Sequence, residues 1–453
     1  MRHIDVHQLA DEAKFNSFHL KVLAWCAVII ICDGYDLAVA GVALPLIMQE
    51  MGVNAQDAGF MMSSALFGMM VGAIFLGTIA DRIGRRPTIA ICVALFSVFT
   101  AASGLVDDPY AFSVMRFIAG LGIGGVMPNV VAQMTEFSPK RIRATMVTLM
   151  FSGYAIGGML AAVLGKGMLE AYGWQSVFLA AGVPVLLVPF ILKSLPETMP
   201  YLIRKNRVAE LQRVLEKMQP AYRATQGDTF HLPVAGGTKG ASVGRLFQNG
   251  RGFSTVMFWT IFFMCLFQVY ALSSWLTKLM ASAGYSLGSA LTFTLVLNFG
   301  AVVGAIGGGW LADRFQIKRV MVVMYLLAAL SIALLGYKVP TPVLYLLVGM
   351  AGATTIGTQI VTYAYTGQFY PIDARSTGIG FASGVGRMGA ILAPIVIGTL
   401  IGMSLPLQTN FLVIAVPAVI AALAAALIRH DCSAGAATAQ HSAPLAATAK
   451  ARA

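Results

Sequence analysis

Apolar stretches of about 20 residues recur along the chain, and this feature limits the possible folds most strongly. A helix of that length spans the hydrocarbon core of a bilayer and satisfies its own backbone there. The stretches lie near 20–46, 58–79, 88–106, 112–134, 143–165, 175–192, 253–275, 289–311, 319–337, 342–364, 376–401 and 410–428. With 58% hydrophobic and 11% charged residues, the 453-residue chain is predicted to be an all-α membrane protein with twelve transmembrane helices, not a soluble enzyme.

The long polar segment at 193–252 separates the first six stretches from the second six. We therefore expect an N-terminal six-helix bundle at 1–192 and a C-terminal six-helix bundle at 253–430, joined by a cytoplasmic central loop at 193–252. The Ala/Ser/Thr-rich composition of 431–453 predicts a disordered cytoplasmic tail.

Basic residues gather in alternate loops. They follow spans two, four, eight and ten and fill the central loop, for example Arg82, Lys140, Arg204, Arg314 and Arg375. The opposite loops offer only Lys166, Lys278 and Lys338. The positive-inside rule then predicts a multi-pass protein of the cell inner membrane with both termini cytoplasmic. The net charge of +12 reflects this topology, and nucleic acid is not an expected partner.

The amino terminus shows no short apolar segment with a small-residue cleavage site, so we expect a cytoplasmic lead-in and no signal peptide. The five cysteines form no Cys-x-x-Cys pair. Two Gly-x-Gly-x-x-Gly matches begin at Gly120 and Gly384, but both lie inside apolar helices and neither follows a strand, so close helix packing explains them. No disulfide, metal or cofactor is predicted.

Two carboxylates interrupt the first apolar stretch, in the sequence Asp33-Gly34-Tyr35-Asp36. An Asp at the centre of a membrane helix costs about 2.5–3.5 kcal/mol on insertion scales, so a pair needs an explanation. Residues three apart share a helix face, which predicts that both acids point into one polar cavity serving as a proton or substrate path. The alternative is a pair of structural acids tied to other helices.

A loop motif occurs twice at a constant offset. Gly77-Thr-Ile-Ala-Asp81-Arg82-Ile-Gly84-Arg85-Arg86 returns as Gly309-Trp-Leu-Ala-Asp313-Arg314, and 313 − 81 gives an offset of 232 residues. The same offset carries Arg143 to Arg375, which indicates two homologous six-span halves. Intramembrane charges do not repeat, as expected of an asymmetric site; they are Asp33, Asp36, Arg116 and Arg387.

This loop motif, the repeat and the central loop resemble the major facilitator superfamily across essentially the whole chain. The Asp-Gly-Tyr-Asp motif, Arg116 before Gly120-x-Gly122-x-Gly124-Gly125, and Glu136-Phe-Ser-Pro139 resemble its aromatic acid:proton symporter branch. Within that branch, Ile4-Asp-Val-His-Gln-Leu9, Phe15-Asn16 and Trp25-Cys26 are most similar to benzoate transporters.

The resemblance implies two pseudo-symmetric six-helix bundles and proton-coupled import of benzoate or a close aromatic carboxylate by alternating access, without enzymatic activity. The expected partners are that carboxylate, a proton and the lipid bilayer, with a monomeric protein. Other organic anions stay open as substrates: hydroxybenzoate, chlorobenzoate or cis,cis-muconate. A membrane sensor that binds an aromatic acid without moving it is a remote alternative.

Site residues follow from charge, burial and the resemblance. For proton coupling we expect Asp33, Asp36, Arg116 and Glu136. Arg387 is expected to bind the substrate carboxylate, because its planar fork suits that group. A permanent pair of Arg387 with Asp33 or Asp36 is the alternative. The ring and its substituents are assigned to Tyr35, Tyr154, Gln268, Tyr270, Asn298, Gln359 and Tyr363, although each alone fits simple packing.

The repeated loop is expected to form a conformational latch of charges between helices. Its residues are Gly77, Asp81, Arg82, Gly84, Arg85, Arg86, Arg143, Asp313, Arg314 and Arg375. The alternative is that these charges only mark topology and cap helix ends. Two rival transporter classes fit less well. Pro196-Glu-Thr-Met-Pro-Tyr201 resembles the sugar-porter signature but has no counterpart after span twelve, and the fifth span lacks the Gly-Pro pair that is usual in drug:proton antiporters.

Overall fold

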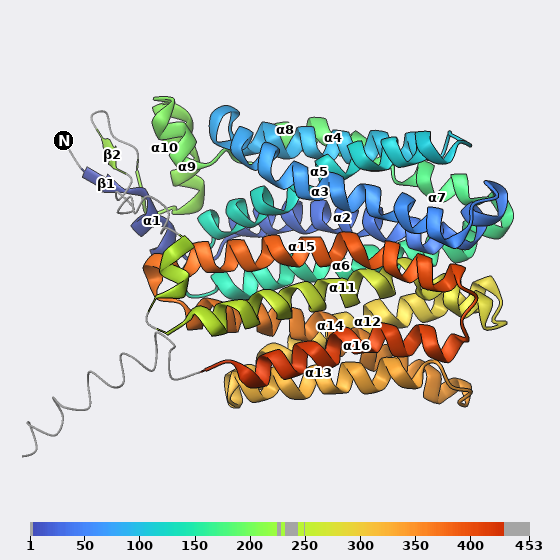
Figure 1. Ribbon diagram of the computed structural model, residues 1–453. Coiled ribbons are helices and arrows are strands. Elements are labelled where there is room, and N and C mark those ends of the chain that lie inside the picture. Colours follow the sequence, from blue (N-terminus) through green and yellow to red (C-terminus); the bar gives the residue numbers. More distant parts are fainter. Residues whose placement is uncertain (1–2, 224–227, 232–242, 249, 430–453) are drawn as a thin grey trace, which may run out of the picture. The chain divides into compact units, whose positions relative to one another are not determined.

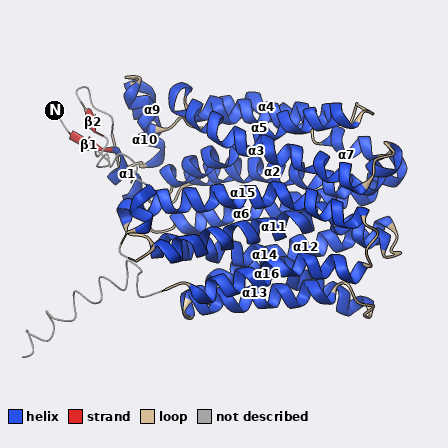
Figure 2. Cartoon of the chain, viewed as in Figure 1, coloured by secondary structure: helices blue, strands red, loops and turns tan. Residues whose placement is uncertain are grey.

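The computed structural model describes residues 3–223, 228–231, 243–248 and 250–429. Within these ranges, 12 helical segments are long and apolar enough to cross a membrane (Figures 1 and 2). The spanning helices of the first half are α2 Ser17–Glu50, α3 Ala55–Ile83, α4 Arg85–Ser103, α5 Pro109–Phe137 and α6 Arg143–Tyr172, followed by a broken sixth span. Those of the second half are α11 Gly252–Ser282, α12 Leu287–Arg314, α13 Ile317–Leu334, α14 Thr341–Phe369, α15 Ile372–Gly402 and α16 Leu407–Leu427. The predicted fold class is confirmed.

The sixth span is not one continuous helix. It consists of α7 Trp174–Ala180, the 3-10 helix η1 Val183–Leu187 and α8 Val188–Ser194. Pro184 and Pro189 lie at the first turns of η1 and α8. A proline has no backbone N–H and its ring clashes with the preceding turn, so the span is interrupted where these residues occur.

The chain separates into two compact units. The first contains Met1–Gly236 with Met280–Leu295, and the second contains Gly237–Leu279 with Val296–Ala453. In the first unit, α5 packs along α3 and α4, and α2 packs along α6. In the second unit, α13 packs against α14 and α16. A buried cluster that includes Phe258, Tyr325 and Tyr365 forms part of the core of the second unit.

Glycines set the spacing between α3 and α5. A Cβ added to Gly120 would lie 2.1 Å from the Ala65 carbonyl oxygen, and one added to Gly124 would lie 2.0 Å from that of Met69. Both distances are far below van der Waals contact, so only glycine permits the helices to approach this closely. The glycine-rich run after Arg116 is therefore a packing surface, as predicted.

The segments predicted as a lead-in and a central loop contain regular structure. β1 His3–Asp5 pairs in parallel with β2 Thr229–His231, so that Ile4 lies opposite Phe230. Between the strands in sequence are α1 Val6–Glu12, α9 Met199–Arg204 and α10 Val208–Met218. The apolar face of α10 is buried. A short 3-10 helix, η2 Val243–Phe247, precedes α11. The predicted tail at 431–453 lies outside the described residues.

Candidate functional site

A buried ion pair connects three helices of the first unit. Arg116 on α5 donates through Nη1 to Asp36 Oδ1 on α2 at 2.6 Å, and the two side chains are 2% and 1% exposed. Thr100 on α4 donates to the Asp36 carboxylate at 2.7 Å, and its oxygen accepts from Arg116 at 2.9 Å. Arg116 Nη2 also reaches the Asp36 carbonyl oxygen at 3.2 Å. Asp36 thus supplies the counter-charge that a buried arginine requires.

Close packing fixes α2 at the level of this pair. A Cβ on Gly34 would lie 2.2 Å from the Tyr154 carbonyl oxygen, and one on Gly157 would lie 2.1 Å from that of Ile31. The Tyr35 hydroxyl donates to the Val177 carbonyl oxygen at 2.8 Å. These contacts hold α2 against α6 and α7, so the Asp36 carboxylate has little freedom to move along the bundle.

Asp33 and Asp36 are both buried, and the structure shows which helices bind the Asp36 carboxylate. Both are 1% exposed and lie one turn apart on α2. The Asp36 carboxylate is directed at α4 and α5, where Thr100 and Arg116 bind it. That both acids line one polar cavity stays a prediction. The Arg116 guanidinium also lies 5.9 Å from the centre of the Phe178 ring, a cation–π distance.

A second charged cluster joins the arginine-rich ends of the helices of the first unit. Glu136 Oε2 lies 3.3 Å from Arg85 Nη1, and Glu136 Oε1 accepts from the Met199 backbone N–H at 2.6 Å, at the start of α9. The buried Glu197 accepts from the backbone N–H groups of Arg85 at 2.9 Å and Arg86 at 3.4 Å, at the start of α4. Each glutamate thus caps a helix N-terminus, where a negative charge is stabilising.

Glu197 has no place among the predicted site residues. The available signal was the Pro196-Glu197-Thr198 sequence after the sixth span, which resembles a sugar-porter motif. In the structure its carboxylate occupies the space beside Gly84, where an added Cβ would lie 2.5 Å from Glu197 Oε2. Gly84 has a φ of +101°, a conformation that favours glycine. Only glycine therefore suits position 84, because it adopts the positive φ without strain and leaves room for the Glu197 carboxylate.

Three of the predicted latch arginines have acidic partners in the first unit. Besides Arg85 with Glu136, Arg86 lies 3.6 Å from Glu210 on α10. Arg143 pairs with Asp11 at the end of α1 and donates to the Ser138 carbonyl oxygen at 3.0 Å.

For the remaining latch residues, the structure shows no contact between an acid and a base among the side chains that it describes. The side chains of Asp81 and Asp313 lie outside the described residues. Arg82 and Arg375 are exposed, and the Arg314 guanidinium lies 4.4 Å from the centre of the Trp310 ring. A Cβ on Gly77 would meet no atom within 4 Å, so close packing does not explain that glycine. The latch stays a prediction.

In the second unit, Arg387 lies near Tyr363, one of the residues predicted to contact the substrate ring. Tyr363 on α14 forms a hydrogen bond of 3.0 Å with Ser383 on α15. Ser383 lies one helical turn before Arg387 in α15, and the Arg387 charge acts on the Tyr363 hydroxyl. The Phe262 ring meets the Tyr363 ring edge-to-face at 4.7 Å. Arg387 is half-buried and forms no ion pair among the described residues. Ser383 is thus a neighbour of Arg387 that sequence reasoning missed.

The other predicted substrate residues are divided between the units. Tyr35 and Tyr154 belong to the first unit, where Tyr154 packs against the buried core. Gln268 on α11 is 1% exposed, and its Nε2 has no hydrogen-bond acceptor among the described residues. Tyr270 packs against the cluster that contains Phe262. Asn298 on α12 and Gln359 on α14 also belong to the second unit and are half-buried.

Comparison with known proteins matches the chain to one superfamily and, within it, to transporters of aromatic acids. The Major Facilitator Superfamily model matches residues 26–337 and 298–448. A benzoate transport protein of Acinetobacter baylyi is 46% identical over 433 residues, which cover 94% of this chain and 93% of that protein. A 4-hydroxybenzoate transporter of the same organism, PcaK, is 33% identical over 93% of each chain. A gentisate transporter of Corynebacterium glutamicum is 35% identical over 88% of this chain and 85% of its own.

Two solved structures share the fold at low sequence identity. The partially occluded inward open conformation of the Escherichia coli xylose transporter XylE has a TM-score of 0.68 at 18% identity, covering 90% of this chain and 98% of that one. A bacterial homolog of the human lysosomal transporter Spinster, inward-facing and occupied, has a TM-score of 0.70 at 16% identity, covering 92% and 97%.

Proposed function

This chain belongs to the Major Facilitator Superfamily, and on that premise we propose that it is a proton-coupled symporter that imports benzoate or a closely related aromatic carboxylate. It is a multi-pass membrane transporter and not an enzyme. The observation that carries the proposed substrate is the 46% identity with a benzoate transport protein over nearly the whole of both chains.

The second candidate substrate class is a ring-hydroxylated benzoate. It is favoured by similarity to the 4-hydroxybenzoate and gentisate transporters, at 33% and 35% identity. Chlorobenzoate and cis,cis-muconate are further anions of the same chemical class. The lower identity of the hydroxylated-acid relatives ranks them behind benzoate.

We further propose the topology that the distribution of basic residues supports. The protein lies in the inner membrane as a monomer, with both termini and the 193–252 segment cytoplasmic. The bundles 1–192 and 253–430 rock about a binding site near the membrane midplane to give alternating access. The charged residues of the latch, among them Asp81 and Asp313, bias the equilibrium between the two conformations.

For proton coupling we assign the central role to Asp36, with Arg116 as its partner and with Asp33 and Glu136 assisting. The pair Asp36–Arg116 supports this role, because adding one proton to Asp36 removes the charge that balances a buried guanidinium. A buried pair broken on one side costs about 3–5 kcal/mol, so protonation supplies a strong drive to rearrange α2 against α4 and α5.

For the substrate we assign the carboxylate to Arg387. The half-buried guanidinium, which forms no ion pair with any residue that the structure describes, supports this assignment, because a dehydrated carboxylate needs a charge-assisted hydrogen bond. Tyr363 with its Ser383 partner, and Gln268 with its unused buried donor, are suited to the ring and its substituents.

Labelled benzoate uptake by proteoliposomes that contain the purified full chain tests this function. We expect a saturable initial rate above that of protein-free liposomes, inhibited by unlabelled benzoate more strongly than by 4-hydroxybenzoate. Stronger inhibition by the hydroxylated acid would favour the second candidate. Saturable benzoate binding without any uptake would favour a membrane sensor.

A further inference from the structure

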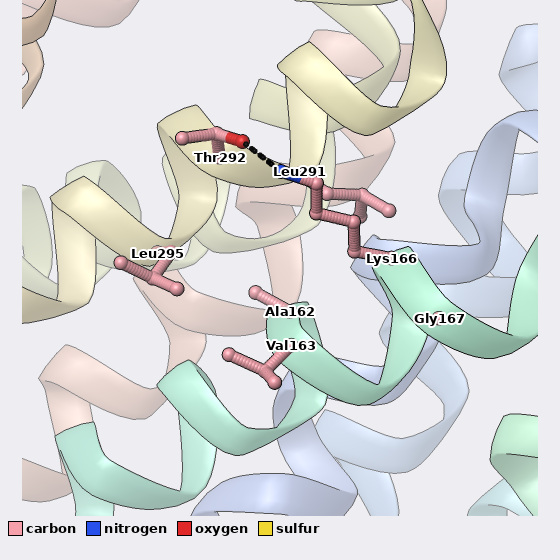
Figure 3. A pocket seen from close by; sticks show the side chains of 7 residues that line it. All are labelled: Ala162, Val163, Lys166, Gly167, Leu291, Thr292 and Leu295. Carbon is pink, nitrogen blue, oxygen red and sulfur yellow. Dashed lines mark hydrogen bonds between the residues drawn. The ribbon is translucent and has the colours of Figure 1, made fainter.

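A cleft of about 440 Å³ lies at the ends of α6 and α12 that are opposite their arginine-rich ends (Figure 3). The part of α12 that lines it belongs to the same compact unit as α6. Most of the lining is apolar, from Ala162, Val163, Leu291 and Leu295. The polar lining comes from Lys166 and Thr292. A volume in this range is typical of small-molecule sites.

The Lys166 ammonium has unused hydrogen-bonding capacity. Its contact with Thr292 Oγ1 is long, at 3.5 Å, while that hydroxyl donates to the Gly288 carbonyl oxygen at 2.9 Å. Glu170 follows one turn later on α6, yet Lys166 makes no ion pair with any residue that the structure describes. Lys166 is exposed and its ammonium has three donors, so a ligand in the cleft can reach it from solvent.

The first turn of α12 adds to the positive charge of the lysine. α12 begins at Leu287 and has no acidic residue in its first turn. The Lys166 chain crosses that turn, since its Cε lies 3.9 Å from where a Cβ on Gly288 would be. The N-terminal end of a helix carries partial positive charge, so it adds to the attraction that the Lys166 ammonium exerts on an anion in the cleft.

We infer that this cleft is a second binding site for an aromatic carboxylate, separate from Arg387, in which Lys166 binds the carboxylate. The apolar side chains of the cleft would hold the ring, which matches an anion with a flat apolar body. This inference rests on the proposed transport of such acids. In the proposed topology the cleft faces the outside, so it would capture the substrate before transport.

Protection of an introduced thiol tests the site directly. Leu295→Cys places a half-exposed thiol in the cleft, to be labelled with a membrane-impermeant maleimide in the full-length protein, with the labelling of the parent protein subtracted. We expect benzoate to slow labelling and neutral benzyl alcohol to have a smaller effect. Protection should persist when Arg387→Ala removes the proposed transport site, and it should be lost with Lys166→Gln.

Transport kinetics supply the second readout. Lys166→Gln should raise the half-saturating benzoate concentration about two- to fivefold, the range expected for a solvent-accessible ion pair, with an unchanged maximal rate. Val163→Trp, which fills the cleft from an exposed position, should act similarly. Lys338→Gln is the matched control, because it removes an exposed lysine that does not line the cleft, and its kinetics should equal those of the parent.

Equal labelling with and without benzoate in the Arg387→Ala protein would overturn the inference. Protection by vesicles of phosphatidylglycerol instead of benzoate would also overturn it, by assigning the cleft to a lipid. If the parent protein transports benzoate while Lys166→Gln and Val163→Trp keep its kinetics, the capture role fails and the proposed function stands. If the parent transports no aromatic acid, the proposed function fails, while the labelling experiment still reports on the cleft.

Discussion

The carboxylate of Asp36 is held by donors from two neighbouring helices, Thr100 on α4 and Arg116 on α5. The ion pair is almost fully withdrawn from solvent. In such surroundings charge is balanced by the partner and not by water, so a change of one proton at Asp36 alters the energy of the whole three-helix contact. This property links a chemical event at one residue to helix packing.

Asp36→Asn should reduce the initial rate of gradient-driven benzoate uptake to that of protein-free liposomes, because an amide does not take up the coupling proton. Exchange of labelled for unlabelled benzoate at equal pH should persist. The same variant leaves Arg116 buried without its counter-charge, so the midpoint of thermal unfolding in detergent should fall, and Asp36→Asn combined with Arg116→Gln should recover part of that loss. Parental uptake under a pH gradient by Asp36→Asn would contradict the assignment.

Arg387→Lys should raise the apparent KM for benzoate about tenfold and keep some transport, because the lysine preserves charge but not the planar two-pronged geometry. Arg387→Ala should remove benzoate binding at the transport site and, with it, that site's preference for benzoate over the neutral benzamide, so that only the weaker binding that depends on Lys166 is left. Calorimetry on the purified variants measures both. Loss of binding in Arg116→Ala, with parental affinity in Arg387→Ala, would reverse the two roles.

At the scale of elements, the start of α4 depends on one glycine and one distant carboxylate. Gly84→Ala should destabilise the protein by about 1–3 kcal/mol, since it combines a left-handed backbone with a clash against Glu197. The midpoint of thermal unfolding measures this effect. Gly307→Ala in α12 is the matched control, because its added methyl group meets nothing within 4 Å. Equal unfolding midpoints for the two variants would show that the fold tolerates a side chain at position 84 beside Glu197.

The amino-terminal segment is tied to the first unit by the Asp11–Arg143 pair and by the backbone N–H of Lys140, which donates to the Asp11 carbonyl oxygen at 3.2 Å. Asp11→Asn should therefore raise amide hydrogen exchange in α1 and in the β1–β2 pair. Glu12→Gln, which changes an exposed neighbour that accepts a hydrogen bond from Gln8 on the same helix, should leave exchange unchanged. Identical hydrogen exchange in Asp11→Asn and the parent would show that the Asp11–Arg143 ion pair does not stabilise this segment.

At the scale of the whole molecule, the repeated loop should control the balance between conformations. Asp81→Asn and Asp313→Asn should each slow benzoate transport while leaving benzoate affinity within about twofold of the parent, because a residue that biases two states need not touch the ligand. Transport rates and calorimetric affinities from the same preparations decide this. Loss of binding in a correctly folded variant would count against a latch.

The extent of the fold that sequence could predict follows from the physics of lipid. Backbone groups in a bilayer must bond within their own helix, so hydropathy alone located the membrane spans and the charge pattern predicted their orientation. The break in span six depended on Pro184 and Pro189, which lie inside an apolar run that hydropathy alone reads as one continuous span. The strands β1 and β2 pair across more than 200 residues, beyond the reach of any local pattern.

Candidate site residues divide in the same way. The need of Arg116 for an acid followed from its burial, but its pairing with Asp36, 80 residues away, is a result of tertiary packing. Glu197 and Ser383 became candidates only through their neighbours, Gly84 and Tyr363. Sequence can therefore identify which buried charges require a partner, whereas the structure identifies the partner.

The most direct test of the central claim is the initial rate of benzoate uptake into proteoliposomes with an alkaline interior, measured beside protein-free liposomes and liposomes containing Asp36→Asn. Both controls are needed, because neutral benzoic acid crosses a bilayer unaided and collects on the alkaline side. A proton symporter predicts a saturable rate that exceeds both controls and falls when the gradient is collapsed. A rate equal to that of protein-free liposomes, or one unchanged by collapse of the gradient, would contradict proton-coupled import.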